Sequence, residues 1–207
     1  MIKYLEGNEI MNRFLSILFV GMLMTPAISI ADNGKYLEFS ILDSSYDSGV
    51  SNVSGATLDE DDSGFAITGG MPLSDNLDLE IGYADFGEAS LSGSSGNTFD
   101  YEGVSYTFNA TATIQLEAES IFIGLKPKMS LTDSLSAYAR LGFNMWDTTL
   151  TTSTGTASAD VSDDGNDLYY GFGVSGVIGG LDVSLSHSYY EFDSDDVDST
   201  ALSISLK

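Results

Sequence analysis

The strongest constraint on the fold is an alternation of apolar and polar residues with a period of two. In the stretch SLSAYARLGFNMWD, residues 134–147, leucine, alanine and phenylalanine occupy the odd positions from 135 to 143. Serine, tyrosine, arginine, glycine and asparagine occupy the even positions from 136 to 144. Successive side chains of a β-strand point to opposite faces, so this period indicates a strand with one apolar and one polar face.

The same pattern recurs in seven other segments, which predicts eight strands in total. They are residues 35–42, 64–71, 77–86, 114–126, 134–147, 167–177, 181–190 and 200–206. Short turns (around 72–76, 131–133 and 179–180) alternate with long polar loops (43–63, 87–112, 148–166 and the shorter 191–198). Residues 104–108 are a candidate hairpin extension within the second loop. Short turns on one side and long loops on the other are typical of outer-membrane barrels.

One strand breaks the pattern. In segment 114–126 the apolar residues lie on even positions up to Ala118 and on odd positions from Ile121 onward. A β-bulge near Glu119 is one explanation. The other is that only the part from Ser120 onward lies in the membrane.

Composition excludes several classes of protein. The 207 residues contain no cysteine, so disulfides and thiolate metal sites are absent. Seven Lys and Arg against 31 Asp and Glu give a net charge of -24, which argues against nucleic-acid binding. Hydrophobic residues make up 43%, too many for a disordered acidic chain. The acidic residues must therefore lie outside the apolar strands.

The amino-terminal region has the features of a secretory signal peptide. The run FLSILFVGMLM, residues 14–24, is too short to span a bilayer as a helix. Asn12 and Arg13 precede it, and the small residues Ser29 and Ala31 fit a cleavage site after Ala31. We therefore assign residues 1–31 to a signal peptide and residues 32–207 to one barrel domain. Because Glu6 and Glu9 are unusual in such a leader, Met11 is the expected start of translation.

Strands that cross a bilayer must form a closed sheet, because hydrocarbon offers no partner for unpaired backbone groups. We therefore predict an all-β fold: an eight-stranded, antiparallel, up-and-down transmembrane β-barrel. Side chains fill the interior of a barrel of this size. The expected interior residues are an ionic cluster of Glu38, Glu80, Lys126 and Arg140, together with Tyr138, Asn144, Tyr169 and Asp182, with room left by Gly82, Gly142, Gly171 and Gly173. A stabilising ionic plug is the favoured interpretation, and a gate for small ions is the alternative.

Aromatic residues gather where the predicted strands approach the long loops. They are Tyr83, Phe86, Phe143, Trp146, Tyr170, Tyr189 and Phe192. Aromatic rings with one wet edge favour the membrane interface, so we expect a girdle that anchors the barrel rather than a ligand platform.

Three phrases resemble the OmpA-like family of small outer-membrane β-barrels: LSDNLDLEIGYADFG (73–87), LTDSLSAYARLGFNMWD (131–147) and DLYYGFGV (167–174). The likeness covers residues 32–207 and concerns the barrel domain only. It implies a place in the outer membrane of a Gram-negative bacterium, and interior Glu and Arg pairs such as Glu80 and Arg140. Family members are structural proteins, adhesins, receptors or narrow channels. Two departures are the absence of a following peptidoglycan-binding domain and of the terminal aromatic residue that the assembly machinery reads.

We expect no enzymatic activity, no catalytic residue and no cofactor. His187, the single histidine, has the lipid-facing parity, whereas Ser188 projects inward and Tyr189 stands where lipid A deacylases have serine. No defined metal loop occurs. Weak candidates for Ca²⁺ ligands are the loop residues Asp59, Glu60, Asp61, Asp62, Asp195 and Asp196, and such ions would bridge to lipopolysaccharide phosphates.

The expected function is therefore a structural or surface-interaction role in the outer membrane, with adhesion- or receptor-type loops and a plugged lumen. The alternative is a narrow porin-like channel for small solutes or ions. The expected partners are outer-membrane lipid and lipopolysaccharide, with divalent cations as bridges, and the expected state is a monomer.

Overall fold

The computed structural model describes residues 34–192 and 195–207. The expected signal peptide, its cleavage after Ala31 and the start at Met11 lie outside the described residues. Within the described part of the chain, no helix is long and apolar enough to cross a membrane.

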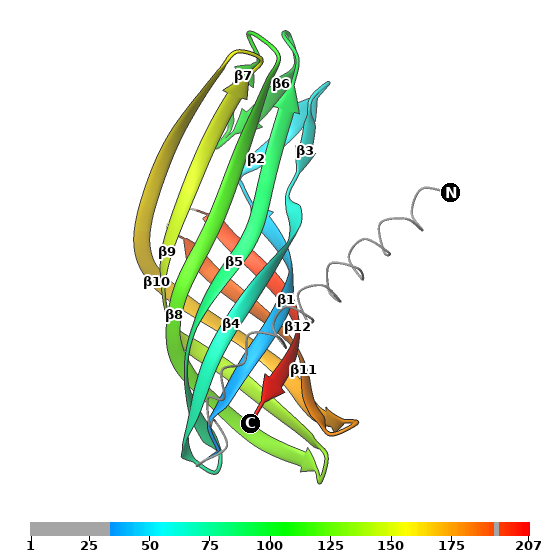
Figure 1. The fold of residues 1–207 in the computed structure, drawn as a ribbon. Coiled ribbons are helices and arrows are strands. Elements are labelled where there is room, and N and C mark those ends of the chain that lie inside the picture. Colours follow the sequence, from blue (N-terminus) through cyan, green and yellow to red (C-terminus); the bar gives the residue numbers. More distant parts are fainter. Residues whose placement is uncertain (1–33, 193–194) are drawn as a thin grey trace, which may run out of the picture.

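Eight antiparallel strands close into a barrel, as predicted (Figure 1). They are β1 (Tyr36–Asp47), β4 (Asp61–Ser74), β5 (Leu77–Gly93), β8 (Ala112–Thr132), β9 (Leu135–Thr154), β10 (Ala157–Ile178), β11 (Leu181–Phe192) and β12 (Asp195–Leu206). Each strand pairs with the next in this order, and β12 pairs with β1 to close the ring. The closed ring pairs the backbone groups that an open sheet would leave at its edges.

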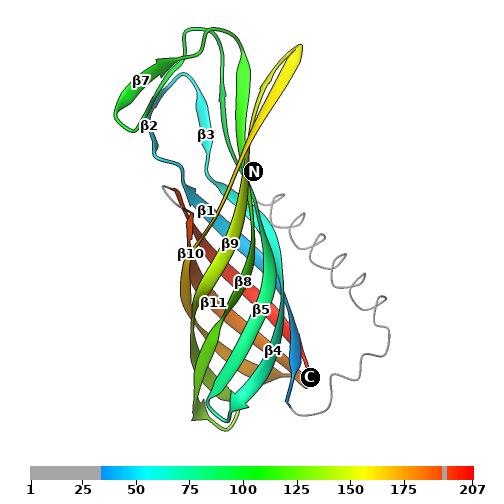
Figure 2. The same ribbon diagram turned by 90° about the vertical axis from the view of Figure 1, so that its left-hand side faces the viewer.

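The long loops are more ordered than the sequence predicts. The expected loop 148–166 is instead a continuation of β9 and β10, which remain paired up to Thr154 and Ala157. The reason lies in the threonine-rich run before that turn, because β-branched residues favour strands even where no lipid contacts them. The barrel wall is consequently tall at β8, β9 and β10 and low at β1, β11 and β12 (Figure 2).

Two other expected loops contain short strands. Loop 43–63 includes β2 (Val50–Ser54) and β3 (Thr57–Asp59), and loop 87–112 includes β6 (Thr98–Tyr101) and β7 (Val104–Thr107). The pair β6–β7 matches the hairpin suggested by residues 104–108. Strand β3 pairs with β5, whereas β2, β6 and β7 form a separate small sheet. This small sheet lies at the end of the molecule away from the chain's C-terminus (Figure 1).

The short turns are two residues long at the opposite end. They hold Asp75 and Asn76, Asp133 and Ser134, and Gly179 and Gly180. Both glycines have positive φ, 62° and 87°, a conformation that favours Gly at such turns. We call this end the short-turn end and the opposite one the outer end.

The two faces of the strands follow the predicted parity. The odd residues of the opening stretch point away from the barrel, and Leu141 and Phe143 are 59% and 62% exposed to the surroundings. The even residues Tyr138, Arg140 and Asn144 are buried inside. The outward face therefore forms an apolar band that suits lipid.

The fourth predicted strand, β8, does not contain the bulge that its irregular parity suggested near Glu119. Strand β8 pairs with β9 in one continuous register through this region, so β8 contains no bulge there. The register shift lies in the neighbouring strand, where Phe86 and Gly87 of β5 stand opposite Ala118 alone. Gly87 has φ of 78°, as such a bulge requires. The even residues Ile114 and Leu116 lie on the same inward-facing side of β8 as Phe122, so the second explanation remains as a prediction.

Candidate functional site

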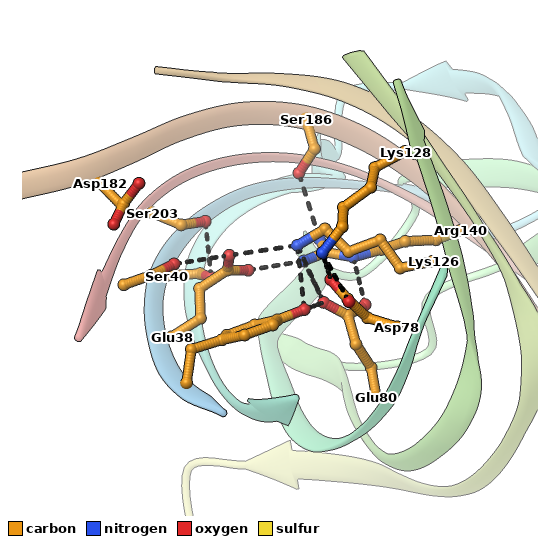
Figure 3. Close-up of polar contacts among 12 residues, drawn as sticks. Glu38, Ser40, Asp78, Glu80, Lys126, Lys128, Arg140, Asp182, Ser186 and Ser203 are labelled. Atoms are coloured by element: carbon orange, nitrogen blue, oxygen red, sulfur yellow. Dashed lines mark hydrogen bonds and ion pairs between the residues drawn. The ribbon is translucent and has the colours of Figure 1, made fainter. Parts of the chain in front are cut away.

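An ionic layer fills the barrel toward its short-turn end. Glu38 of β1, Glu80 of β5, Lys126 of β8 and Arg140 of β9 all occupy inward positions and are at most 8% exposed (Figure 3). Arg140 bridges the two acids: its Nη2 lies 2.6 Å from Glu38 Oε1 and its Nε lies 2.8 Å from Glu80 Oε2. Lys126 Nζ lies 3.0 Å from Glu80 Oε1. Two carboxylates and two cations thus neutralise one another.

Other polar groups complete the layer. The Tyr36 hydroxyl donates to Glu80 Oε1 at 2.5 Å, and Ser205 Oγ donates to Glu38 Oε2 at 3.1 Å. Lys126 Nζ also stands 4.4 Å from the centre of the Tyr138 ring, a cation–π contact. Tyr36 shares the inward parity of Glu38, so the alternation predicts that its side chain faces the lumen. The alternation does not predict its hydrogen bond to Glu80.

A second ion pair continues the layer toward the short turns. Lys128 Nζ lies 2.6 Å from Asp78 Oδ1, and the Asp78 side chain is 3% exposed. Below it, an open vestibule of about 340 Å³ extends to the short turns. The sequence reasoning missed Asp78, although it has the parity of Glu80.

Asp182 has the expected inward parity and lines the vestibule, but it lies outside the ionic layer. It is half-buried at the short-turn end, where its Oδ2 pairs with Lys207 Nζ at 2.9 Å. In Figure 3 it lies apart from the ionic cluster. Its position beside the turn at Gly179 and Gly180 places it at the edge of the lumen rather than inside.

An aromatic layer fills the barrel above the ionic layer. Its members are Phe86, Phe122, Trp146, Tyr169, Tyr190 and Phe192, each at most 7% exposed. The rings of Tyr169 and Tyr190 stack at 5.4 Å, and Phe86 meets Tyr190 edge-on at 4.7 Å. The Trp146 Nε1 group donates to Asp167 Oδ2 at 2.8 Å.

This layer corrects the predicted girdle. Phe86, Trp146 and Phe192 lie inside the barrel, because they have the parity of the inward residues on their strands. Phe143 and Tyr170, in contrast, are 62% and 45% exposed on the outward face. The girdle prediction relied on the preference of aromatic residues for membrane boundaries. The two-residue period of each strand alone predicts the inward position of these three rings.

Glycines make room for the large interior rings. A Cβ atom on Gly124 would lie 2.3 Å from the Tyr169 hydroxyl oxygen. A Cβ on Gly173, one of the expected spacers, would lie 2.5 Å from the Tyr138 ring. Such distances are far shorter than van der Waals contact, so these strands approach the rings only because they carry no side chain there.

The single histidine lies on the outer surface. His187 Nδ1 is 3.0 Å from Thr200 Oγ1, and its ring contacts Phe172 and Tyr189. Ser188 is 5% exposed and belongs to the inward set, so the two side chains occupy opposite faces of β11.

Carboxylates surround the outer edge of the apolar band. Asp85, Glu119, Asp147 and Asp164 stand in register across β5, β8, β9 and β10, and Asp47, Asp196 and Glu191 stand in register across β1, β12 and β11. We call these seven residues the acidic collar. Burial, and then the neighbouring charges of Asp47 and Asp198, raise the pKa of Asp196 above its ordinary value.

The remaining calcium candidates do not converge. Asp61 is exposed and Asp62 half-buried at adjacent positions of β4, and Asp62 accepts the Glu88 N–H at 2.9 Å. Glu60 accepts the Ser48 hydroxyl at 2.5 Å, and Asp59 stands opposite Ser90. Among residues 34–192 and 195–207, no three acidic or histidine side chains form a group that would hold a metal ion.

In the small sheet, a carboxylate is held by local hydrogen bonds. Asn52 Nδ2 donates to Asp100 Oδ2 at 2.7 Å, which joins β2 to β6. This hydrogen bond and one from Ser105 lower the pKa of Asp100.

Comparison with known proteins identifies the fold. The family model of the OmpA-like transmembrane domain matches residues 31–191. Ail, the attachment invasion locus protein of Yersinia pestis, is similar with a TM-score of 0.50 at 15% identity, covering 83% of this chain and 97% of Ail. Neisserial surface protein A is similar with a TM-score of 0.50 at 12% identity, covering 84% and 97% of the two chains. No curated protein sequence matches.

A second structure of Ail, in complex with the heparin analogue sucrose octasulfate, gives a TM-score of 0.51 at 13% identity, with 83% of this chain and 97% of Ail covered. These solved structures are small outer-membrane barrels, which confirms the predicted fold. Together with the family match, they confirm a location in the outer membrane of a Gram-negative bacterium. Since the family match spans more than half of the sequence, this chain belongs to the OmpA-like transmembrane domain family.

Proposed function

We propose that this chain is a structural barrel of the outer membrane with an outer end that binds other molecules, and that it neither catalyses a reaction nor conducts solutes. The observation that carries the proposal is the pair of buried layers, ionic and aromatic, stacked along the lumen. The tall outer wall of β8, β9 and β10 supports the interaction role, because it extends far past the apolar band.

The narrow channel is the competing function, and conductance in planar bilayers distinguishes the two. We expect no current steps above those of a detergent control. The variant Arg140→Gln, which weakens the bridge between Glu38 and Glu80, measures whether the ionic layer acts as a gate. Current steps whose frequency rises with protein concentration in the wild type would contradict the closed lumen.

We further propose that the acidic collar binds lipopolysaccharide through divalent cations. The collar lies directly outside the apolar band, at the level where anionic lipid headgroups are expected. Carboxylate oxygens and phosphate oxygens are both ligands for Mg²⁺ and Ca²⁺. Ail forms a complex with a heparin analogue, a polyanion. In this chain the described Lys and Arg residues all lie at or below the ionic layer, so an anion at the outer end needs a metal ion as bridge.

Co-purification of lipopolysaccharide tests this second proposal. The variant carrying Asp85→Asn, Glu119→Gln and Asp147→Asn should retain less lipopolysaccharide than the wild type, and EDTA should release it from the wild type. A control with Asp100→Asn and Glu102→Gln removes acids of the small sheet and should behave like the wild type. Equal retention in all three, with and without EDTA, would reject the bridge.

We also propose that the barrel acts as a monomer, because the closed ring leaves no unpaired strand edge within the apolar band. Light scattering of the protein in detergent micelles should give the mass of one chain, and a dimer mass would contradict this.

A further inference from the structure

An apolar cavity of about 550 Å³ lies at the outer end, above the aromatic layer. Its walls come from the inner face of the tall wall and from the small sheet. The main apolar lining residues are Leu58, Leu91, Phe99, Ile114, Leu116 and Leu150. Pockets that bind small molecules occupy roughly 300–1,000 Å³ and are lined mainly by apolar side chains, so this cavity has both the size and the lining of a binding site.

The bulge in β5 forms one wall of the cavity. Below the bulge the even residues of β5 face inward, as Glu80 and Phe86 do. Beyond Gly87 the odd residues face inward, and Ala89 and Leu91 are each 4% exposed. The extra residue therefore turns an apolar pair toward the cavity and turns Glu88 away from that side.

The small sheet supplies aromatic rings to the opposite wall. Phe99 stacks on Tyr106 at 5.5 Å and contacts Phe108 at 5.4 Å. Leu116 lines the cavity and packs against the buried cluster that contains the aromatic layer. Leu116 thus joins the cavity to the aromatic layer, whose buried rings block the lumen between the cavity and the ionic layer.

The charge around the cavity selects the kind of ligand. Asp163 lines it directly, and the acidic collar adds carboxylates on the outward face of the same end of the barrel. No described Lys or Arg lies at this end of the molecule. A concave site surrounded by one sign of charge concentrates ligands of the opposite sign and repels others.

We propose that this cavity binds a small cationic amphiphile, a molecule with one apolar chain and an ammonium or guanidinium head. The chain lies between Leu91, Leu116 and Leu150, and the head lies near Asp163 at the opening. Anionic and neutral amphiphiles of the same length bind less well, because they offer the carboxylates no positive charge.

The affinity should depend on chain length. Burial of one methylene group strengthens binding by about fourfold, so affinity should rise stepwise with the alkyl chain and level off when the cavity is full. A bilayer shows no such limit, so a plateau separates binding in the cavity from partition into lipid.

Trp146, the single tryptophan, is a built-in reporter. It belongs to the buried cluster against which Leu116 packs, and Thr148, two residues further along the same inward face, lines the cavity. The experiment uses the full barrel in nanodiscs of zwitterionic phospholipid. The probe is dodecyltrimethylammonium brominated at the chain end, and quenching of Trp146 fluorescence reports its arrival. Brominated dodecyl sulfate and brominated dodecanol are the anionic and neutral comparators.

We expect saturable quenching by the ammonium probe at concentrations at least tenfold below those of both comparators. Leu150→Asn should weaken it about tenfold or more, whereas the matched control Val104→Asn should not, because Val104 is 54% exposed and lies outside the cavity lining. Leu150 is 41% exposed, and heat-modified electrophoretic mobility verifies that each variant is folded. Quenching that never saturates, that is equal for the three probes, or that is unchanged by Leu150→Asn would overturn the proposal.

Discussion

The ionic layer and the acidic collar place carboxylates in opposite situations. In the ionic layer, Glu38 and Glu80 are 1% and 0% exposed, and each lies within 3.0 Å of a cation. In the collar, Asp85, Glu119 and Asp147 stand directly opposite one another on adjacent strands. The sequence thus pairs its charges where water is excluded and leaves like charges together where water is present.

The difference teaches which charges hold the barrel together. A buried charge that loses its partner retains the full cost of its transfer from water, so the ionic layer is sensitive to any single change. Like charges on a wet surface repel weakly, and salt screens them. Changes in the ionic layer should therefore affect stability most, and changes in the collar should depend on solution conditions.

The largest effect is expected for Arg140→Met. The substitution removes the group that bridges Glu38 and Glu80 and leaves two buried carboxylates with Lys126 alone. We expect the free energy of unfolding to fall by about 3–5 kcal/mol. Reversible urea unfolding in lipid vesicles measures it.

Lys207→Met is the matched control for that experiment. It breaks the ion pair with Asp182, in which the two side chains are 58% and 29% exposed, and should cost about 0–1 kcal/mol. An equal loss of unfolding free energy in Arg140→Met and Lys207→Met would show that burial does not distinguish these ion pairs.

The aromatic layer should contribute almost as much. Phe86→Ala removes a ring that is fully buried against Tyr190 and Phe192, and we expect a loss of about 3 kcal/mol. Tyr106→Ala, at a ring that is 45% exposed in the small sheet, should cost less than half of that. The same unfolding assay compares them, and a larger loss for Tyr106→Ala would contradict the ranking.

The alternation of residues accounts for most of the barrel. It correctly places all eight strands, because the side-chain period of a strand is local and a bilayer enforces it on the outward face. It also places Glu38, Glu80, Lys126 and Arg140 on the inward faces. Which acid meets which cation depends on the shear of the whole sheet, and no local pattern contains that information.

The outer end was harder to predict for a physical reason. Above the membrane no lipid selects the outward side chains, so residues 148–166 continue as strands without an apolar alternation. The bulge at Phe86 and Gly87 appears in the register between β5 and β8, which sequence alone does not show. The sequence does not predict the cavity for the same reason, since most of its lining residues come from segments expected to be loops, and only Ile114 and Leu116 come from a predicted strand.

A smaller effect is expected for Asp147→Asn in the collar. The substitution relieves repulsion from Glu119 and Asp164 on the two neighbouring strands. At low salt it should stabilise the fold by about 0.5 kcal/mol, and the gain should vanish near 1 M salt, where the Debye length is about 3 Å. The free energy of unfolding of the variant and the wild type, measured at low salt and near 1 M salt, gives this gain. Asp160→Asn, which stands opposite Thr151, is the control and should show no such gain.

The smallest effect is expected for the removal of one charge at Asp196 in the collar. Asp196 stands opposite Asp47 and Glu191 at the outer end of β12, and its pKa is raised. Protonation therefore favours the folded state: the wild type has this stabilisation in full below the unfolded pKa of about 3.9 and loses it as pH rises through the raised folded value. Asp196→Asn mimics the protonated form at every pH.

Asp196→Asn should therefore stabilise the barrel by a few tenths of a kcal/mol at pH 7, about what an exposed pair of like charges costs after solvent screening. The difference from the wild type should shrink as pH falls through the raised pKa, because both proteins then carry a neutral group at this position. Unfolding midpoints from pH 3 to pH 8 measure it. A difference that stays constant with pH would mean that the asparagine acts through packing rather than through removal of the charge.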